Sequence, residues 1–207
     1  MTIVCLSDTH ARHAGLKIPA GDILVHAGDI SERGYTAEIT DFLRWFSKLP
    51  HRHKVFIAGN HDWLFEREPE IASALIPAGV TLLQDSGCEF DGLKVWGSPV
   101  TPRFFDWAFN RERGEEIRKH WQLIPPGTDI VISHGPAWGI LDQNLQRKSQ
   151  GCADLLRRLE EVQPRLHVCG HIHSGYGQSK LKETLMVNAS ICNEVYYPIN
   201  APVVVEL

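Results

Sequence analysis

The chain has 207 residues, is 43% hydrophobic and carries 21 basic and 25 acidic side chains, for a formal net charge of −4. This length and hydrophobic content predict one domain over residues 1–207, with a core large enough to fold without covalent cross-links. The weakly acidic balance lacks the basic footprint that duplex nucleic acid or an anionic membrane selects. We therefore expect a small substrate, and neither duplex nucleic acid nor a membrane as partner.

The N-terminal segment and the cysteines favour a cytoplasmic location. The apolar run from Ile3 to Leu6 is short and follows no basic segment, which argues against a secretory signal. No apolar stretch approaches the roughly 20 residues that span a bilayer. The five cysteines are odd in number and form no C-x-x-C pair, so we expect reduced thiols buried as small hydrophobes. Composition leaves the oligomeric state open, a homodimer included.

The first part of the chain alternates strands with a helix. Apolar residues at i, i+3, i+4 and i+7 predict an amphipathic helix from Tyr35 to Leu49, with Thr36 as its N-cap. Short apolar runs that break into polar residues predict buried strands. They are Ile3 to Leu6, Asp22 to Ala27 and Lys54 to Ala58.

Further strands and two helices follow. Asp91-Gly92 between two apolar runs predicts a hairpin with a type I′ turn, its strands at Glu89-Phe90 and Leu93 to Trp96. We predict helices at Arg113 to Gln122 and Ala153 to Val162. Other strands are predicted at Val80 to Leu83, Asp129 to Ile132, Leu166 to Cys169, Leu185 to Val187 and Val203 to Val205. The order of elements indicates an α/β fold with a mixed sheet.

Oxygen and imidazole donors follow five of the predicted strands: Asp8, His10, Asp29, Asn60, His61, His134, His171 and His173. Ligands of open α/β sheets bind beyond the carboxyl ends of the strands, so these side chains should converge there. Carboxylate, imidazole and amide donors without thiolate suit Mn, Fe, Co, Ni or Zn. The donors are too many for one ion. His26 and His167 lie inside strands and are expected to be hydrogen-bonded core residues rather than ligands.

Five motifs in chain order resemble the signature of the calcineurin-like metallophosphoesterases: Asp8-Thr9-His10, Gly28-Asp29, Gly59-Asn60-His61-Asp62, Ser133-His134-Gly135 and Gly170-His171-Ile172-His173. The resemblance implies a four-layer α-β-β-α sandwich of two mixed β-sheets and a centre of two divalent ions, with Mn or Fe/Mn expected. It implies one ion held by Asp8, His10 and His173. It implies a second ion held by Asn60, His134 and His171, with Asp29 as the bridge.

The chemistry of these residue types agrees with those assignments. A carboxylate has two oxygens that can span ions about 3.5–4 Å apart, and metal binding lowers the pKa of water, so a bridging hydroxide is the expected nucleophile. His61 followed by Asp62 is typical of an imidazole oriented by a carboxylate, able to protonate the departing oxygen or stabilise charge. The resemblance gives His61 this role. The alternative is a loop pair that holds the turn.

Two longer segments, Gly97 to Asn110 and His134 to Asp142, resemble the metallophosphoesterase-domain-containing phosphodiesterases, a branch similar to class III cyclic nucleotide phosphodiesterases. This implies hydrolysis of phosphodiesters such as 2′,3′- or 3′,5′-cyclic nucleotides. Because every ligand position is filled, we expect an active enzyme. Two alternatives are a phosphomonoesterase, including a phosphoprotein phosphatase, and a non-catalytic interaction scaffold.

Candidate substrate-binding residues flank the motifs. Arg12 and His13 follow His10 on one loop and either contact a phosphate or are solvated. Phe105, Trp107 and their aromatic neighbours either stack on a nucleobase, worth roughly 1–3 kcal/mol per base, or pack a core or dimer contact. Trp138 is a further candidate for the apolar wall of a substrate site, and Arg103 is a further candidate to contact a phosphate. The few cations near the motifs favour diesters over dianionic monoesters.

Overall fold

Five strands form the first sheet of the computed structural model, which describes residues 1–207. The sheet order is β13-β1-β2-β3-β4, with β1 to β4 parallel and β13 antiparallel at the edge. The bounds are Thr2–Leu6 for β1, Ile23–His26 for β2, His53–Phe56 for β3, Val80–Leu82 for β4 and Val203–Glu206 for β13.

Six strands form the second sheet, in the order β11-β12-β10-β9-β6-β5. The four central strands are parallel, and the strand at each edge is antiparallel to its neighbour. The bounds are Ser86–Phe90 for β5, Leu93–Ser98 for β6, Ile130–Ser133 for β9, Leu166–Cys169 for β10, Gly177–Leu181 for β11 and Thr184–Asn188 for β12. Two short strands, β7 (Thr101–Pro102) and β8 (Asn110–Arg111), pair separately.

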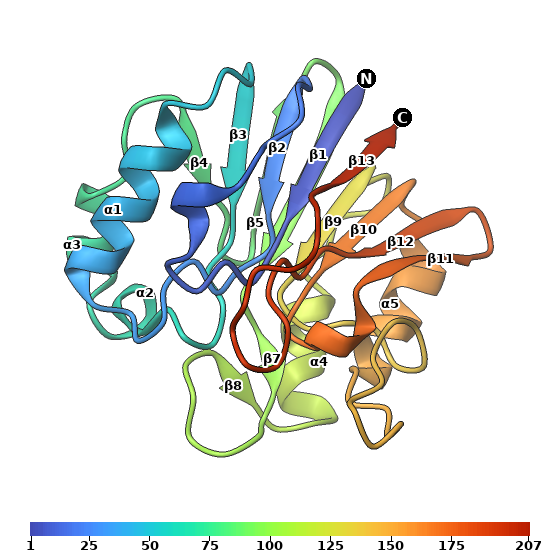
Figure 1. The fold of residues 1–207 in the computed structure, drawn as a ribbon. Helices are drawn as coiled ribbons and strands as arrows, with labels where there is room; N and C mark the ends of the chain where they lie inside the picture. Colours follow the sequence, from blue (N-terminus) through green and yellow to red (C-terminus); the bar gives the residue numbers. More distant parts are fainter.

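Helices cover the outer faces of the two sheets (Figure 1). The first sheet is covered by α1 (Thr36–Ser47), α2 (Trp63–Arg67) and α3 (Pro69–Ala74), and the second by α4 (Glu115–Trp121) and α5 (Ala153–Val162). Single 3₁₀ turns lie at His13–Gly15 and His173–Gly175. No helix has the length and apolar content needed to cross a bilayer.

Both faces of the central strands are buried, which explains their uninterrupted apolar sequences. In β1, Ile3 and Cys5 belong to the core between the two sheets, whereas Val4 and Leu6 belong to the core beneath α1. A third apolar layer, which includes Trp121, lies between the second sheet and helices α4 and α5. The expected four-layer α-β-β-α sandwich is thus confirmed.

Local signals predicted most elements, with some differences at their ends. The hairpin between β5 and β6 has Asp91 at φ 50° and Gly92 at φ 86°, as a type I′ turn requires. Helix α1 starts at Thr36 and is capped at Tyr35, not at Thr36. The Glu38 carboxylate provides the cap, because it accepts the backbone N–H groups of Arg33 and Tyr35.

The parallel strands of both sheets end on the same side of the molecule. In Figure 1 the connecting loops gather below the carboxyl ends of β1, β2 and β3, on the side opposite the two termini. A backbone bridge between Ser7 and Ser190 joins the segments that follow β1 and β12 at this end. The two sheets therefore present their strand ends to a common space.

Candidate metal centre

The residues at these strand ends adopt backbone conformations that are uncommon outside glycine. Asp8, His10, Asp29 and His171 have φ values of 54°, 42°, 55° and 66°. Left-handed backbone at non-glycine residues is strained and persists where the surrounding structure imposes it, often at functional sites. The backbone here turns sharply where the strands end, and the donor atoms of these side chains lie close together in groups.

Two glycines allow the loops to approach each other closely. A Cβ atom at Gly59 would collide with the Asp29 carboxylate, and one at Gly170 would collide with the Asp8 carboxylate. The glycines of the Gly-Asn-His-Asp and Gly-His-Ile-His motifs therefore leave room for the carboxylates that the strand ends bring together.

Asp8, His10 and His173 form the first group of candidate ligands. The Nε2 atoms of His10 and His173 lie 3.3 Å apart, and Asp8 Oδ1 lies 3.4 Å from His173 Nε2. Donor atoms bound to one ion at about 2.0–2.2 Å lie roughly 3 Å or more from each other. The spacing of this group suits one divalent ion.

Asp29, His134 and His171 form the second group, and Asn60 adjoins it. His134 Nε2 lies 2.9 Å from Asn60 Oδ1 and 3.3 Å from Asp29 Oδ2. The same Asp29 oxygen lies 3.7 Å from His10 Nε2, in the first group. Asp29 thus stands between the two groups, where a bridging carboxylate would stand.

The remaining polar atoms of the candidate ligands are held by hydrogen bonds. The Nδ1–H groups of His134 and His173 donate to the carbonyl oxygens of Ala27 and Asn193, both at 2.9 Å. This fixes the tautomer and leaves Nε2 as the free donor atom, as is usual for metal-binding histidines. The Asp8 carboxylate accepts the His171 N–H and the Ser190 hydroxyl. The donor set is therefore oriented for divalent cations.

The electrostatics of the cluster favour a cation at its centre. Burial by itself would raise the pKa of Asp29, but His134 and His61 lower it well below its usual range. Burial lowers the pKa of His134, yet the Asp29 carboxylate outweighs it and raises that pKa to about 9. Burial lowers the pKa of His10 to about 4, which keeps its imidazole neutral, the form that binds metal.

The backbone, rather than Asp62, orients the His61 imidazole. His61 Nδ1–H donates to the Glu32 carbonyl oxygen at 2.7 Å, and the ring stacks on Trp107 with centroids 4.4 Å apart. The Asp62 carboxylate instead accepts the N–H groups of Ser31 and Gly59 among its donors. The expectation that Asp62 orients the imidazole is wrong; the carboxylate holds the turn, the alternative reading of this pair.

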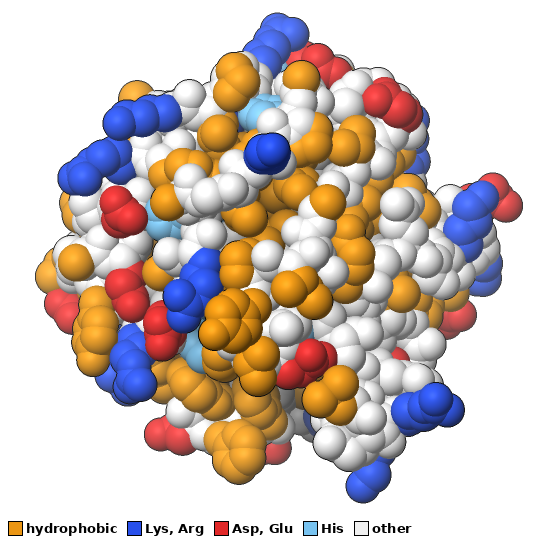
Figure 2. All heavy atoms as spheres, in the orientation of Figure 1, with side chains coloured by type: hydrophobic (Ala, Val, Ile, Leu, Met, Phe, Trp, Pro, Cys, Tyr) orange, Lys and Arg blue, Asp and Glu red, His pale blue; other side chains and the backbone are white.

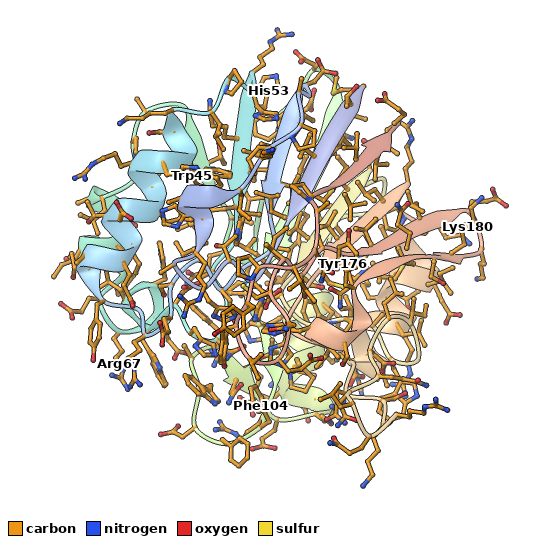
Figure 3. The ribbon with its side chains drawn as sticks, viewed as in Figure 1. Trp45, His53, Arg67, Phe104, Tyr176 and Lys180 are labelled. Atoms are coloured by element: carbon orange, nitrogen blue, oxygen red, sulfur yellow. The ribbon has the colours of Figure 1, made fainter.

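A cavity of about 570 Å³ opens over the candidate ligands. Of the predicted substrate-binding residues, Phe105 and Trp107 line it, and Phe105 is 86% exposed. In Figure 3, Phe104 lies over β8 at this end of the molecule. Tyr196 also lines the cavity, and its ring meets that of His10 edge-on with centroids 4.6 Å apart. Sequence analysis missed Tyr196 because the loop after β12 carries no motif.

Four other predicted substrate contacts do not line this cavity. His13 is buried against α1, where it contacts Asp41 and Trp45, which agrees neither with a phosphate contact nor with a solvated side chain. Arg103 pairs with Glu112 at 2.6 Å. Arg12 is exposed and Trp138 half-exposed, and neither lines the cavity. Substrate contacts by these four residues are not supported.

The expectations for the two histidines inside strands, and for most of the cysteines, are met. His26 and His167 are fully buried and hydrogen-bonded to Thr9 and Ser133. All five cysteines are free, and four of them are buried.

Comparison with known proteins agrees with this geometry. The profile of the calcineurin-like phosphoesterase family matches residues 1–175, most of the chain. The chain belongs to the calcineurin-like phosphoesterase family. It is 41% identical to metallophosphoesterase domain-containing protein 1 of Homo sapiens, over 99% of this chain and 70% of that protein. It is 34% identical to UPF0046 protein C25E10.12 of Caenorhabditis elegans, over 99% of this chain and 80% of that protein.

Solved structures share the fold of this calcineurin-like phosphoesterase. Phosphopantetheinyl hydrolase from Mycobacterium tuberculosis gives a TM-score of 0.67 at 15% identity, over 98% of this chain and 95% of that one. TT1561 of Thermus thermophilus gives a TM-score of 0.56 at 16% identity, covering 90% and 88%. The family binds divalent metals, and the clusters described above are candidate ligands for them. The resemblance to the metallophosphoesterase-domain-containing branch is likewise confirmed.

Proposed function

We propose that this calcineurin-like phosphoesterase is a hydrolase that uses two divalent ions to cleave phosphodiesters, with small aromatic or cyclic nucleotide diesters as its substrate class. The observation that carries the diester preference is the wall of the cavity over the candidate ligands. Four of its side chains are aromatic, one is the additional carboxylate of Asp106, and none is Lys or Arg.

Asp8, His10 and His173 would hold one ion, Asn60, His134 and His171 the other, and Asp29 would bridge them. Mn, or Fe with Mn, is our first expectation for these donors. Two ions held there would supply a nucleophile at neutral pH and Lewis-acid stabilisation of phosphoryl oxygens. The five free cysteines favour a reducing compartment such as the cytoplasm for this activity.

The charge of the wall distinguishes the two ester classes. A monoester dianion would gain from cations beside the metal ligands, whereas Asp106 adds a negative charge there. A diester carries one negative charge and a second organic group, which the rings of Phe104, Phe105 and Trp107 can contact. Stacking of a base on such a ring is worth roughly 1–3 kcal/mol. The wall therefore favours the diester.

In this proposal His61 assists the leaving group. Its Nδ1–H donates to the Glu32 carbonyl oxygen, which leaves Nε2 free to contact a substrate in the cavity that His61 lines. A proton given from Nε2 to the departing oxygen would assist cleavage of esters whose leaving group is a poor anion.

Kinetics with a panel of substrates and metals tests the proposal. Purified enzyme would be loaded in turn with Mn, Fe(II), Co, Ni and Zn. It would be assayed with bis-p-nitrophenyl phosphate, 2′,3′- and 3′,5′-cyclic nucleotides and p-nitrophenyl phosphate. We expect a higher kcat/KM for the diesters. A tenfold preference for the monoester in every active metal, about 1.4 kcal/mol, would instead establish a phosphomonoesterase.

A variant of the wall sharpens the test. Phe105→Ala should raise KM for aromatic diesters by about tenfold, corresponding to one lost stacking contact, and leave p-nitrophenyl phosphate hydrolysis nearly unchanged. Leu123→Ala, which removes another exposed apolar side chain outside the cavity, is the matched control. An equal effect of Phe105→Ala on both ester classes would mean that the aromatic wall does not determine the preference for diesters.

A further inference from the structure

A second cavity of about 380 Å³ lies on the other side of His61. His61, Trp107 and Tyr196 line both this cavity and the one over the candidate ligands, so they form the boundary between the two. A general acid must lie within hydrogen-bond reach of the oxygen that it protonates. The leaving group of a substrate assisted by His61 therefore lies beside this boundary, with the second cavity open to it.

The second cavity combines flat rings with positive charge. Tyr35 and Trp63 add two aromatic side chains to its wall, and Arg33 and Arg67 add two guanidinium groups. Neither arginine forms an ion pair with an acidic side chain, whereas nearby Arg111 is paired with Glu66. The two guanidinium groups are therefore free to bind an anion.

The arginine-bearing segments are held in place by the fold. Arg67 lies over the Trp63 ring, with its guanidinium carbon 3.9 Å from the ring centroid. Both Arg33 and Tyr35 donate their N–H groups to the Glu38 carboxylate. Figure 3 shows Arg67 below α1, at the same end of the molecule as Phe104. Because the two backbone segments that form the wall are already held in place, they should lose little conformational freedom when a ligand binds.

Gly34 allows these two segments to approach each other closely. Its φ is 74°, and a Cβ there would collide with the backbone nitrogen of Trp63. The Gly34 N–H donates to the Ser31 hydroxyl, which in turn donates to Asp62. The loop that carries Arg33 is therefore joined to the turn that carries His61.

Charge distinguishes this cavity from its neighbour on the other side of the centre. The lining of the second cavity includes one carboxylate, Glu32, against two guanidinium groups. A third cavity of about 300 Å³ beside His173 includes Glu194 and no Lys or Arg. An anionic group that extends from the scissile phosphate should therefore enter the cavity beside His61.

We propose that this cavity is a subsite for a leaving group that combines a flat ring with a second negative charge, as in a linear diester whose leaving group is a nucleotide. The proposal rests on the proposed diesterase function. In the reaction, the P–O bond to the leaving group breaks, water supplies the new oxygen on phosphorus, and the departing oxygen takes a proton. The anion on the leaving group binds Arg33 and Arg67 and does not react.

Two matched diesters test the subsite: the methyl phosphate esters of 6-hydroxy-2-naphthoate and of 6-hydroxy-2-naphthamide. They differ in one charge on a purine-sized ring. The amide has the intrinsically better leaving group, because a carboxamide withdraws electrons more strongly than a carboxylate. We nevertheless expect kcat/KM to be at least about tenfold higher for the carboxylate ester, the range of a hydrogen-bonded charge pair.

The preference for the carboxylate ester should be smaller in Arg33→Gln and in Arg67→Gln than in the wild type. The double variant should abolish this preference without lowering kcat/KM for the amide ester. Arg44→Gln, which removes an exposed arginine from α1, is the control. Fluorescence anisotropy of the free naphthoate product gives a readout independent of turnover. The product should bind the wild type and the control more tightly than the double variant.

Three results would overturn the subsite: no preference for the carboxylate ester, a preference that survives in the double variant, or product binding that is the same in all variants. If one of these results is found and the enzyme still hydrolyses both esters, the proposed diesterase function stands and only the proposed subsite is overturned. Failure to hydrolyse any diester in any metal would overturn the proposed function and the subsite together.

Discussion

His61 lies close enough to the candidate ligands to raise a question about its role. His61, whose Nε2 makes no hydrogen bond, belongs with His10 and Asp29 to a third group of residues whose donor atoms all lie within 4.8 Å of one another. Its other nitrogen donates to Glu32, an arrangement that metal-binding histidines also use. Metal content and leaving-group dependence together distinguish a ligand from a general acid.

We predict that His61→Ala keeps its full metal content and loses about 10²- to 10⁴-fold in kcat on diesters with alkyl leaving groups, the usual contribution of a general acid. The loss should be much smaller with p-nitrophenyl leaving groups, which depart without a proton. Elemental analysis and steady-state kinetics would measure both effects. His120→Ala, at a histidine paired with Asp85 on the surface, is the control.

Loss of an ion from His61→Ala would make this residue a ligand. An equal loss of activity for good and poor leaving groups, with the metal retained, would indicate stabilisation of transition-state charge instead.

Asp62 is predicted to act on stability rather than on proton transfer. Its carboxylate accepts four hydrogen bonds, from the N–H groups of Ile30, Ser31 and Gly59 and from the Ser31 hydroxyl. In Asp62→Asn an amide NH₂ would face these donors, so the free energy of unfolding should fall by about 1–3 kcal/mol. Denaturant unfolding would measure this fall, with Glu160→Gln, at an exposed carboxylate on α5, as control. An unchanged stability with a leaving-group-dependent loss of activity would contradict the assignment.

At the level of single residues, the sequence predicted which side chains meet at the centre but not what surrounds them. Asp8, Asp29 and His134 were identifiable because each follows a buried strand. Tyr196 and Arg67 were not, because their positions depend on the left-handed backbone of Tyr196 and on stacking of Arg67 over Trp63. The Glu32 carbonyl was also missed, because any residue type can provide a backbone oxygen.

Elements with two buried faces were predicted best. The central strands of both sheets give continuous apolar runs, and α1 and α5 give a clear 3.6-residue period. Helices α2 and α3 were missed because five and six residues are too few to show that period. Strand β11 was missed because it lies at a sheet edge and reads Gly-Gln-Ser-Lys-Leu. The pairing of strands into two sheets came from the family resemblance alone.

Because the contact between β9 and β10 includes the buried histidine His167, we predict that the stability of the protein depends on pH. His167 on β10 is fully buried, and its Nε2 lies 2.8 Å from the Ser133 hydroxyl oxygen. Its Nδ1 has no hydrogen-bond partner. Burial lowers the pKa of His167 to about 3, against 6.5 for the unfolded chain. Below pH 6.5 the unfolded state therefore binds a proton that the folded state excludes.

It follows that the stability associated with neutral His167 is fully present above pH 6.5 and is lost as the pH falls towards 3, by up to about 1.4 kcal/mol per pH unit. His167→Asn should show a shallower fall in unfolding free energy between pH 6.5 and pH 4. Urea unfolding at several pH values would measure the difference. Parallel curves for the two proteins would contradict a neutral buried His167.

At the scale of the molecule, the candidate ligands come from both sheets. Asp8 and Asp29 follow strands of the first sheet, and His134 and His171 follow strands of the second. Ions bound between them would join the two halves of the sandwich and stabilise the folded state by mass action, by about 2.7 kcal/mol at one hundred times Kd. Chelation should therefore lower Tm, and added Mn should restore it. A Tm that is insensitive to chelation would argue against ions bound between the sheets.

Figure 2 shows hydrophobic side chains gathered on the lower part of this face of the molecule. The exposed ring of Phe105 and the exposed side chains of Val195 and Tyr197 come from the loops at this end. Of these three side chains, Phe105 lines the cavity over the candidate ligands. The organic groups of a substrate bound at this end would meet apolar side chains, as the proposed diesterase function requires.

The number of ions bound per chain, measured by elemental analysis on the wild type and on Asp29→Asn, tests the two-ion centre most directly. We expect two ions per wild-type chain and depletion of both ions in Asp29→Asn, because the Asp29 carboxylate stands between the two groups of ligands. One ion per wild-type chain at saturating metal, or two ions retained at full occupancy in Asp29→Asn, would contradict it.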